Sequence, residues 1–339
     1  MEALVTYAPF KMGFEHRPDP RPARGEVAIR TQAVSLCGSD IHLYRGDHPY
    51  RTYPMIFGHE ATGVVEAVGE GVTGFAPADP VILEPLIPCG KCYPCRIGRR
   101  NCCSRMQTVG VTTEGALAEL FVVPAHCVYR RPAGLPPSVA ALVEPFSIGF
   151  QAVARGQIDA ADRVVILGAG PIGLTTLAAA REQGARVAIA DLLESRLIIA
   201  QRMGAELIIN SSQADLAAVV LDWTEGEGAS VVVEAVGSPQ TLESAIRLVA
   251  DAGRVVIVGV TERTFALRGV DVTKKELTIC GSRNNLGRFQ KAIDFVAGNT
   301  ELARGMITQS YPFKEAIAAF EKADRDPAET CKVVIRFET

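Results

Sequence analysis

The sequence lacks an excess of charge of either sign. Its 35 lysine and arginine residues stand against 38 aspartate and glutamate residues, which leaves a formal net charge of −3. The basic residues are scattered, the densest run being RIGRR at positions 96–100, and aromatic residues make up only 6% of the chain. A nucleic-acid-binding surface usually gathers its lysines and arginines on one face. The composition therefore argues against a nucleic-acid partner.

The sequence also lacks a hydrophobic run long enough to cross a membrane. Its most apolar stretch, residues 164–180, is shorter than the about 20 residues that a spanning helix needs, and it contains glycine and proline. The N-terminal segment MEALVTYAPF has no basic region followed by an apolar core, so it does not resemble a signal peptide. These absences predict a cytoplasmic protein without a membrane partner.

The chain is long enough for two domains, because 339 residues exceed the size at which one hydrophobic core stops growing. Its first 140 or so residues contain short β-like runs separated by glycine, proline and aspartate, which predicts a β-rich domain. Apolar strands then alternate with helical segments, which is typical of a parallel sheet. From residue 281 onward two helical segments and a strand follow, and the pattern alone lets this tail join either domain.

A glycine-rich segment, RVVILGAGPIGL, connects a predicted strand to a predicted helix. It has the spacing G-x-G-x-x-G, with Pro171 and Ile172 between the second and third glycines, which are Gly168, Gly170 and Gly173. Glycines at these positions let the backbone turn and approach a pyrophosphate, whose charge is met by amide groups at the helix N-terminus. The motif in this context predicts a dinucleotide-binding site.

An acidic residue, Asp191, ends the next predicted strand, at about the spacing of 20 residues that the motif requires. A carboxylate there accepts hydrogen bonds from ribose hydroxyls and repels a 2′-phosphate. The sequence therefore predicts NAD in preference to NADP. Arg196 moderates this prediction, since a nearby guanidinium accommodates a phosphate.

Cysteines are unevenly distributed: five of the nine lie between Cys89 and Cys103. In a reducing compartment such a cluster favours a metal over disulfides. Cys89, Cys92 and Cys95 form two consecutive C-x-x-C spacings, and either Cys102 or Cys103 can supply a fourth thiolate. Four thiolates close a tetrahedral zinc site and leave no position for substrate. This pattern predicts a structural zinc.

A second group of possible metal ligands lies in the segment from Ser35 to Glu60. Cys37, His59 and Glu60 are residue types that bind zinc, and a set drawn from separate segments that leaves one position open is typical of catalytic zinc. A short GHE segment is by itself equally typical of a turn with a hydrogen-bonded histidine, so these residues alone leave both interpretations open.

Several motifs occur together in a recognisable order: CGSDIH, GHE, the four-cysteine cluster, VEPF and GAGPIG. Over nearly the whole chain they resemble the zinc-dependent medium-chain dehydrogenases, and with KKELTICGSRN they are most similar to the sorbitol and sugar-acid (L-galactonate) branch. The resemblance implies an α/β protein with a GroES-like β-rich catalytic domain and a doubly wound Rossmann domain. The expected boundaries are residues 1–145 with 284–339 for the first and 146–283 for the second.

The resemblance also implies a ligand set for each zinc. Cys37 and His59 match the family's catalytic ligands, and Glu144 of VEPF matches the carboxylate that replaces a second thiolate in the polyol branch. Glu60 is expected to be a direct or water-linked partner of this zinc. For the structural zinc, the family spacing favours Cys103 as the fourth ligand.

Further roles carried over from the resemblance concern protons and substrate. Ser39 and His42 match the hydroxyl and imidazole that relay the substrate proton to solvent, and Asp40 is expected to orient His59. Arg283 matches an arginine that reaches the substrate pocket in the polyol branch. A guanidinium there would bind a carboxylate through two parallel hydrogen bonds.

These expectations combine into a zinc-dependent oxidoreductase that transfers a hydride from a secondary alcohol of an aldonate, such as L-galactonate or L-gulonate, to NAD. Its cofactors are one catalytic zinc, one structural zinc and NAD, and it is expected to form a homodimer or homotetramer. Two alternatives stay open: a dehydrogenase of neutral polyols, and a non-enzymatic zinc- and NAD-binding regulator on the same fold.

The chain departs from the resemblance in one hairpin. Relatives commonly have a Gly-Asp-Arg turn where this sequence has Ala78, Asp79 and Pro80. The departure involves no expected ligand.

Overall fold

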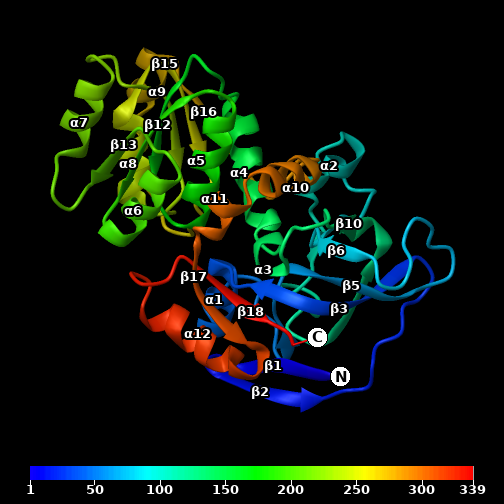
Figure 1. The fold of residues 1–339 in the computed structure, drawn as a ribbon. Helices are drawn as coiled ribbons and strands as arrows, with labels where there is room; N and C mark the ends of the chain where they lie inside the picture. The colour runs from blue at the N-terminus through cyan, green and yellow to red at the C-terminus, as the bar shows by residue number, and fades with distance from the viewer. Residues whose placement is uncertain (339) are drawn as a thin grey trace. The chain divides into compact units, whose positions relative to one another are not determined.

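The computed structural model describes residues 1–338, which form two compact units (Figure 1). The first comprises residues 1–144 and 289–338, and the second comprises Pro145–Arg288. None of the helices formed by these 338 residues has the length and apolar character of a membrane span.

The first unit is mostly β-structure. Its strands form a seven-stranded sheet with the path β10-β6-β5-β3-β18-β17 and β9 beside β3, a three-stranded sheet β2-β1-β4 and a pair β7-β8. In chain order its elements are β1 (Glu2–Ala8), β2 (Lys11–His16), β3 (Glu26–Ser35), α1 (Gly38–Arg45), β4 (Met55–Ile56), β5 (Glu60–Val68), β6 (Pro80–Leu83), β7 (Leu86–Ile87), α2 (Tyr93–Arg96), η1 (Arg100–Cys102), β8 (Gln107–Thr108), β9 (Leu120–Pro124), η2 (Ala125–Cys127), β10 (Val128–Arg130), α3 (Pro137–Ala140), α10 (Phe289–Gly298), α11 (Thr300–Arg304), β17 (Ile307–Pro312), η3 (Phe313–Glu315), α12 (Ala316–Arg325) and β18 (Lys332–Arg336).

Strand β3 holds the large sheet of this unit together. It pairs antiparallel with β5, β9 and β18, and most of its residues are buried. At its C-terminal end Ser35 lies opposite Glu60 of β5 on one side and Val334 of β18 on the other. From Phe289 on, the C-terminal tail, whose domain the sequence pattern left open, thus belongs to the first unit. Its strand β18 borders the strand that leads to Cys37.

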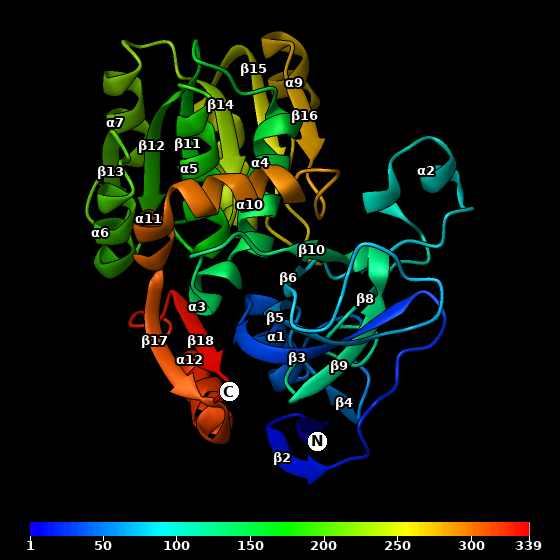
Figure 2. The same cartoon turned by 45° about the vertical axis from the view of Figure 1, so that its right-hand side comes forward.

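The second unit is a six-stranded sheet in the order β13-β12-β11-β14-β15-β16, and every neighbouring pair is parallel. This confirms the predicted parallel sheet, and the order is the one typical of dinucleotide-binding folds. Figure 2 shows the strands side by side with helices along them. The elements are α4 (Val143–Gly156), which begins at the end of the first unit, then β11 (Arg163–Leu167), α5 (Pro171–Glu182), β12 (Arg186–Asp191), α6 (Glu194–Arg202), β13 (Leu207–Asn210), α7 (Leu216–Trp223), β14 (Ala229–Glu234), α8 (Pro239–Leu248), β15 (Val249–Ile257), α9 (Gly269–Lys275) and β16 (Thr278–Gly281).

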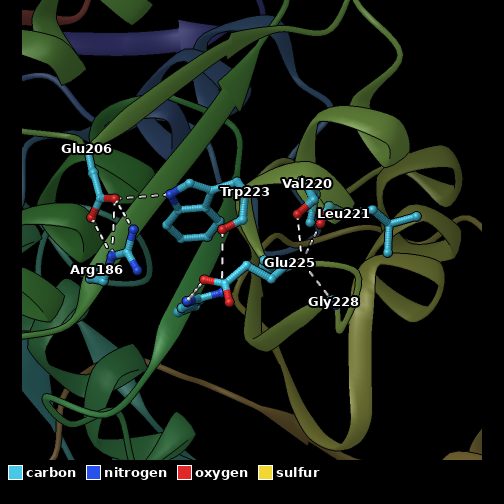
Figure 3. Close-up of polar contacts among 9 residues, drawn as sticks. Arg186, Glu206, Val220, Leu221, Trp223, Glu225 and Gly228 are labelled. Carbon is cyan, nitrogen blue, oxygen red and sulfur yellow. Dashed lines mark hydrogen bonds and ion pairs between the residues drawn. The ribbon is translucent and has the colours of Figure 1, made fainter.

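Polar contacts connect neighbouring elements at the end of this parallel sheet where its strands begin (Figure 3). Arg186, which begins β12, donates from Nε to Glu206 Oε2 at 2.9 Å, and its guanidinium lies 5.7 Å from the ring centre of Trp223. Trp223 Nε1 in turn donates to Glu206 Oε1 at 3.1 Å. These contacts join β12, the start of β13 and the end of α7. The opposite edge, where the strands' carboxyl ends lie, carries Gly168 and Asp191.

In the hairpin that departs from the family pattern, at residues 78–80, one residue has a strained backbone conformation. Ala78 has φ +72°, in the left-handed region that favours glycine. A non-glycine residue there costs about 1–2 kcal/mol. Its amide still donates to Val65 O at 2.8 Å, so the turn keeps its hydrogen bond although alanine fits it poorly.

Replacing this alanine by glycine is expected to stabilise the protein. Ala78→Gly relieves the left-handed strain but adds freedom to the unfolded chain, for a net gain of about 0.5–1 kcal/mol in the free energy of unfolding. Denaturant unfolding of the protein measures the change. Ala76→Gly in the same turn, where φ is not positive, is the matched control and should lose about 0.4–1 kcal/mol. A loss in both variants would contradict the assignment of strain to Ala78.

Candidate functional site

Four cysteine side chains of the first unit converge in the segment around α2 and η1, which Figure 2 shows extending from the strands of that unit. The sulfur atoms of Cys89, Cys92, Cys95 and Cys103 all lie within 4.8 Å of one another. Cys92 Sγ is 3.4 Å from Cys95 Sγ and 3.7 Å from Cys103 Sγ. Four thiols that converge in this way are the donor set of a closed tetrahedral zinc site.

The segment that carries these four cysteines, called the cysteine lobe below, has backbone amides that stabilise thiolates. Amide groups of Cys89 and Arg105 each donate to Cys103 Sγ at 3.3 Å. Backbone hydrogen bonds from Cys95 and Ser104 lower the pKa of Cys92 to about 5, which favours the thiolate that binds metal. Burial and the neighbouring thiols raise the pKa of Cys95 to about 12. A zinc ion, when bound, would offset the cost of ionising this thiol.

The structure distinguishes the two candidates for the fourth ligand. Cys103 is buried and belongs to the converging group, whereas Cys102 does not belong to it. The 3₁₀ turn η1 ends at Cys102. The next residue, Cys103, lies against Cys89, whose amide donates to its sulfur. The site therefore uses Cys103, as the family spacing implied.

A second converging group is built at the end of β3 and the start of β5. Donor atoms of Cys37, His59 and Glu60 lie within 4.8 Å of one another. Cys37 caps the N-terminus of α1, and His59 immediately precedes β5. Because Ser35 pairs with Glu60 across the two strands, residues far apart in sequence come together here. A thiol, an imidazole and a carboxylate are suitable ligands for zinc, so the residues fit a catalytic metal site.

A buried aspartate organises this second group. Asp40 Oδ2 accepts from the amide of Cys37 at 2.8 Å, and Oδ1 lies 3.4 Å from Gly58 N and 3.5 Å from His59 Nδ1. Burial opposes protonation of His59, but Asp40 and Cys37 together outweigh it and raise the pKa of His59 well above its usual value. Metal binding at this imidazole therefore displaces a proton. At 3.5 Å His59 Nδ1 has no hydrogen-bond partner among the described residues, so Asp40 acts on this imidazole mainly through its charge.

The sequence interpretation missed a buried lysine beside these donors. Lys332, the first residue of β18, is 1% exposed, and its Nζ donates to both carboxylate oxygens of Glu60. Burial alone disfavours the ammonium, but the attraction of Glu60 and Cys37 outweighs it and raises the pKa of Lys332. A lysine at the head of the apolar run KVVI was the available signal.

Other expected residues lie around this group. Glu144 is buried near the start of α4 but is not a member of the converging donor set. Burial raises the pKa of Glu144 to about 7 against the opposing effect of His59. Ser39 is half-buried in the first turn of α1, and His42, farther along α1, is exposed with Nδ1 2.9 Å from Asp47 Oδ1. Their roles stay predictions.

The glycine-rich segment of the second unit forms a tight turn between β11 and α5. Gly168 has φ +100°, and a Cβ on Gly173 would lie 1.8 Å from the carbonyl oxygen of Gly168. A Cβ on Gly170 would meet nothing closer than Arg196 Nη1, at 4.0 Å. Helix α5 then begins with Pro171 and Ile172. The turn thus presents open backbone at a helix N-terminus, an arrangement that suits a phosphate group.

The acidic residue expected to contact ribose lies beside this turn. Asp191 ends β12, and its two oxygens accept from the amides of Ala169 at 2.7 Å and Leu193 at 2.9 Å. Arg196 Nη1 lies 3.9 Å from Asp191 Oδ2. The carboxylate is therefore held in place at the strand end, with a cation close to it. Arg283, the expected substrate residue, is exposed just after β16 in this same unit.

Comparison with protein families matches each unit of the chain. Residues 23–133 match the alcohol dehydrogenase GroES-like domain, and residues 171–298 match the zinc-binding dehydrogenase family. Starvation-sensing protein RspB of Escherichia coli K12 is 33% identical over 99% of both chains, and L-galactonate-5-dehydrogenase of the same organism is 32% identical over 99% of both. L-threonine 3-dehydrogenase of Pyrococcus furiosus is 40% identical over 71% of this chain and 70% of its own length.

A solved structure agrees with these relatives. RspB from Escherichia coli CFT073, complexed with its cofactor NADH, superposes with a TM-score of 0.93 at 33% identity, and 99% of each chain is covered. The chain belongs to the family of zinc-containing medium-chain alcohol dehydrogenases. It is an NAD-dependent zinc enzyme that acts on the CH–OH group of a small-molecule alcohol. The predicted family, fold class, enzyme class and cofactors are thereby confirmed.

Two cysteine variants test the ligand set of the structural zinc. Cys92→Ser removes a thiolate ligand and is expected to lose the lobe zinc, about half of the bound metal, and to lower the unfolding temperature. Cys102→Ser, the matched control, should keep both zinc ions and the unfolding temperature of the unmodified protein. Metal analysis and thermal unfolding measure the two effects. Equal zinc loss in the control would contradict the assignment of Cys103.

Proposed function

We propose that this enzyme oxidises a secondary alcohol of a sugar acid, an aldonate such as L-galactonate or L-gulonate, to a keto acid with reduction of NAD. The observation that carries the proposal is the end-to-end similarity to L-galactonate-5-dehydrogenase. The convergence of Cys37, His59 and Glu60 supports it, because the same chain retains a donor set for a catalytic metal.

The metal-binding residues supply the acid–base part of the reaction. A zinc ion, when bound, polarises the hydroxyl oxygen of the substrate and makes its proton easier to remove. Cys37 and His59 hold this ion, and we assign Glu144 as a further ligand, in keeping with its charge interaction with His59. Asp40 acts on the His59 ring through its charge beside Nδ1.

Ser39 and His42 move the released proton toward solvent. Ser39, in the first turn of α1, passes the proton from its Oγ to His42 one turn later on the same helix. The Nδ1 atom of His42 faces Asp47, which leaves Nε2 as the nitrogen that accepts the proton. With its side chain 55% exposed, His42 then releases the proton to water.

The turn between β11 and α5 binds the dinucleotide. Gly168, Gly170 and Gly173 bring the backbone, with Pro171 and Ile172 at the start of α5, to the pyrophosphate. Asp191 binds the ribose hydroxyls and thereby favours NAD. The proximity of Arg196 to Asp191 partly offsets the negative charge, so the expected preference is large but not absolute.

The remaining assignments follow from the family. We assign residues 1–145 with 284–339 to the GroES-like catalytic domain and residues 146–283 to the Rossmann domain, with boundaries that differ by at most five residues from those of the two compact units. The enzyme is proposed to work in the cytoplasm as a homodimer or homotetramer.

A second candidate substrate is L-threonine, which the 40% identity to L-threonine 3-dehydrogenase favours. Threonine and the aldonates both carry a carboxylate and a secondary alcohol, so both suit a site with a guanidinium that binds carboxylate. A neutral polyol such as sorbitol lacks that carboxylate. A non-enzymatic regulator on this fold would turn over none of the three.

Removing the charge of Asp191 tests the proposed preference for NAD over NADP. Asp191→Asn keeps an oxygen for the amides of the turn but removes the repulsion of a 2′-phosphate, so the NAD to NADP ratio of kcat/KM is expected to fall about tenfold or more. Steady-state rates with each nucleotide give the ratio. Asp215→Asn, at the exposed N-cap of α7, is the control. If the unmodified enzyme already used NADP as readily as NAD, the attraction of the 2′-phosphate by Arg196 would outweigh its repulsion by Asp191, and the predicted preference for NAD would be wrong.

A substrate panel combined with one arginine variant tests the sugar-acid proposal. NADH formation should be fastest with L-galactonate or L-gulonate, slower with L-threonine and slowest with sorbitol. Arg283→Lys keeps the charge but loses the two parallel hydrogen bonds, so KM for the aldonate should rise about tenfold while KM for sorbitol stays nearly constant.

The exposed Arg288 serves as the matched control, since Arg288→Lys changes the same chemical group without an assigned role. Equal losses on aldonate and sorbitol in the Arg283 variant would mean that Arg283 does not bind a carboxylate. A preference for sorbitol in the unmodified enzyme would make the neutral polyol the substrate class.

A further inference from the structure

The segment of residues 281–286, called the Arg283 loop below, follows β16 and has an unfavourable conformation. Asn284 has φ +49°, in the left-handed region. Asn285 is 2% exposed, yet neither polar atom of its side-chain amide has a hydrogen-bond partner among the described residues. A left-handed residue other than glycine and a buried amide without a protein partner are both unfavourable. The loop therefore keeps this conformation because neighbouring elements hold it.

Helix α4 holds both ends of the Arg283 loop. Arg155 Nε donates to the carbonyl oxygen of Gly281 at 3.0 Å, and the amide of Leu286 donates to Gln151 Oε1 at 3.2 Å. Gln151 and Arg155 are four residues apart, so they lie on one face of the helix. Both ribbon views show α4 next to β16 (Figures 1 and 2). The two contacts leave Arg283 between two fixed points of the backbone.

The start of the Arg283 loop is fixed by the sheet as well as by α4. The amide of Ser282 donates to the carbonyl oxygen of Ile257, at the end of β15, at 2.8 Å. Cys280 Sγ, on β16, donates to the carbonyl oxygen of Arg155 at 3.5 Å. At the far end of the loop the contact with α4 comes from the side chain of Gln151. Gln151 is therefore the residue whose replacement should loosen the loop without disturbing the sheet.

Gln151 is a polar residue at a buried position of α4. It is 3% exposed, and its neighbours along the helix, Phe150, Ala152 and Val153, are buried as well. Glutamine is rarely buried unless its amide is hydrogen-bonded, since its removal from water is unfavourable. An apolar side chain would fill the same space without that cost. The hydrogen bond with the amide of Leu286 gives the glutamine a reason to be there.

Arg283 needs a fixed backbone for the role proposed above. Two parallel hydrogen bonds to a carboxylate require that the plane of the guanidinium is aligned with the carboxylate. A displacement of about 1 Å in a group that binds substrate can remove much of its effect. A loop that is held at both ends presents the guanidinium from one place.

We propose that Gln151 is a positioning residue for substrate binding, which holds the Arg283 loop so that the guanidinium of Arg283 is placed for the carboxylate of the substrate. Gln151 acts through the backbone of the loop and touches neither substrate nor nucleotide. This inference rests on the proposed role of Arg283. It adds a residue of a different element, α4, to the discrimination between acidic and neutral substrates.

The first test measures the loop itself and needs no substrate. Gln151→Met removes the acceptor of the Leu286 amide but keeps an unbranched side chain of similar length. Amide hydrogen exchange in the peptide that covers residues 282–288 should become about tenfold faster. Gln201→Met, at an exposed position of α6, is the matched control and should leave exchange in this peptide unchanged. Unchanged exchange in a folded Gln151→Met protein would overturn the proposal.

The second test separates positioning from folding. In Gln151→Met the KM for L-galactonate should rise about tenfold, whereas the KM for sorbitol and the KM for NAD stay nearly constant. A loss of stability alone would not separate the two substrates. Gln151→Glu, which keeps an oxygen that accepts from the Leu286 amide, should restore most of the affinity for L-galactonate. Equal increases in KM on L-galactonate and sorbitol would mean that Gln151 does not act through the carboxylate contact.

The double variant Gln151→Met with Arg283→Lys tests whether the two residues act by one route. If Gln151 acts through Arg283, the KM for L-galactonate in the double variant should equal that of Arg283→Lys alone. A further increase would mean that Gln151 acts elsewhere, and the inference would be wrong. An unmodified enzyme that oxidises no alcohol with a carboxylate would instead refute the proposed function, and the substrate role of Gln151 with it, whatever the exchange measurement shows.

Discussion

The pairing of β3 with its three neighbours is the constraint on which the catalytic group depends. Strand β3 alone brings β5 and β18 to opposite sides of one strand end, at Ser35. The chain leaves that strand end through Cys37, enters β5 through His59, and begins β18 with Lys332. A one-residue slip in either pairing would turn these side chains to the other face of the sheet. The metal donors are thus specified by backbone register before any side-chain contact is considered.

The two metal sites of the first unit are built on different physical principles. The cysteine lobe draws its ligands from one short segment and uses backbone amides to favour thiolates, so its chemistry is local. The catalytic group draws on segments that only the sheet brings together, and it contains buried ionisable side chains of both signs. The lobe is a closed set of four identical ligands. The catalytic group combines three different donor side chains, one of which, Glu60, also accepts hydrogen bonds from Lys332. This difference corresponds to a structural role for one metal and a chemical role for the other.

Much of the fold and of the site was predictable from local sequence patterns. The alternating strands and helices from Arg163 to Gly281 indicated the parallel sheet, and the spacing of Cys89, Cys92 and Cys95 indicated the lobe, because both signals lie within short windows. The position of the C-terminal tail was not predictable in this way, since it depends on the pairing of β18 with β3.

Lys332 escaped prediction for the same reason. Nothing near it in sequence indicates a partner, and Glu60 lies 272 residues away. The left-handed backbone at Ala78 was likewise hidden, because alanine gives no local sign of that conformation; only the departure from the family pattern drew attention to the turn.

The long sequence separation between Glu60 and Lys332 has a consequence for how the enzyme acquires its metals. The whole nucleotide-binding unit, Pro145–Arg288, is synthesised between them. The cysteine lobe is complete once Cys103 has emerged, and short cysteine-rich segments fold around zinc as they bind it. The catalytic group gains its lysine only after the second unit has been made and the chain has returned to β3. The cysteine lobe thus has all four of its ligands before the chain is complete, whereas the buried charges of the catalytic group are balanced only when Lys332 reaches Glu60.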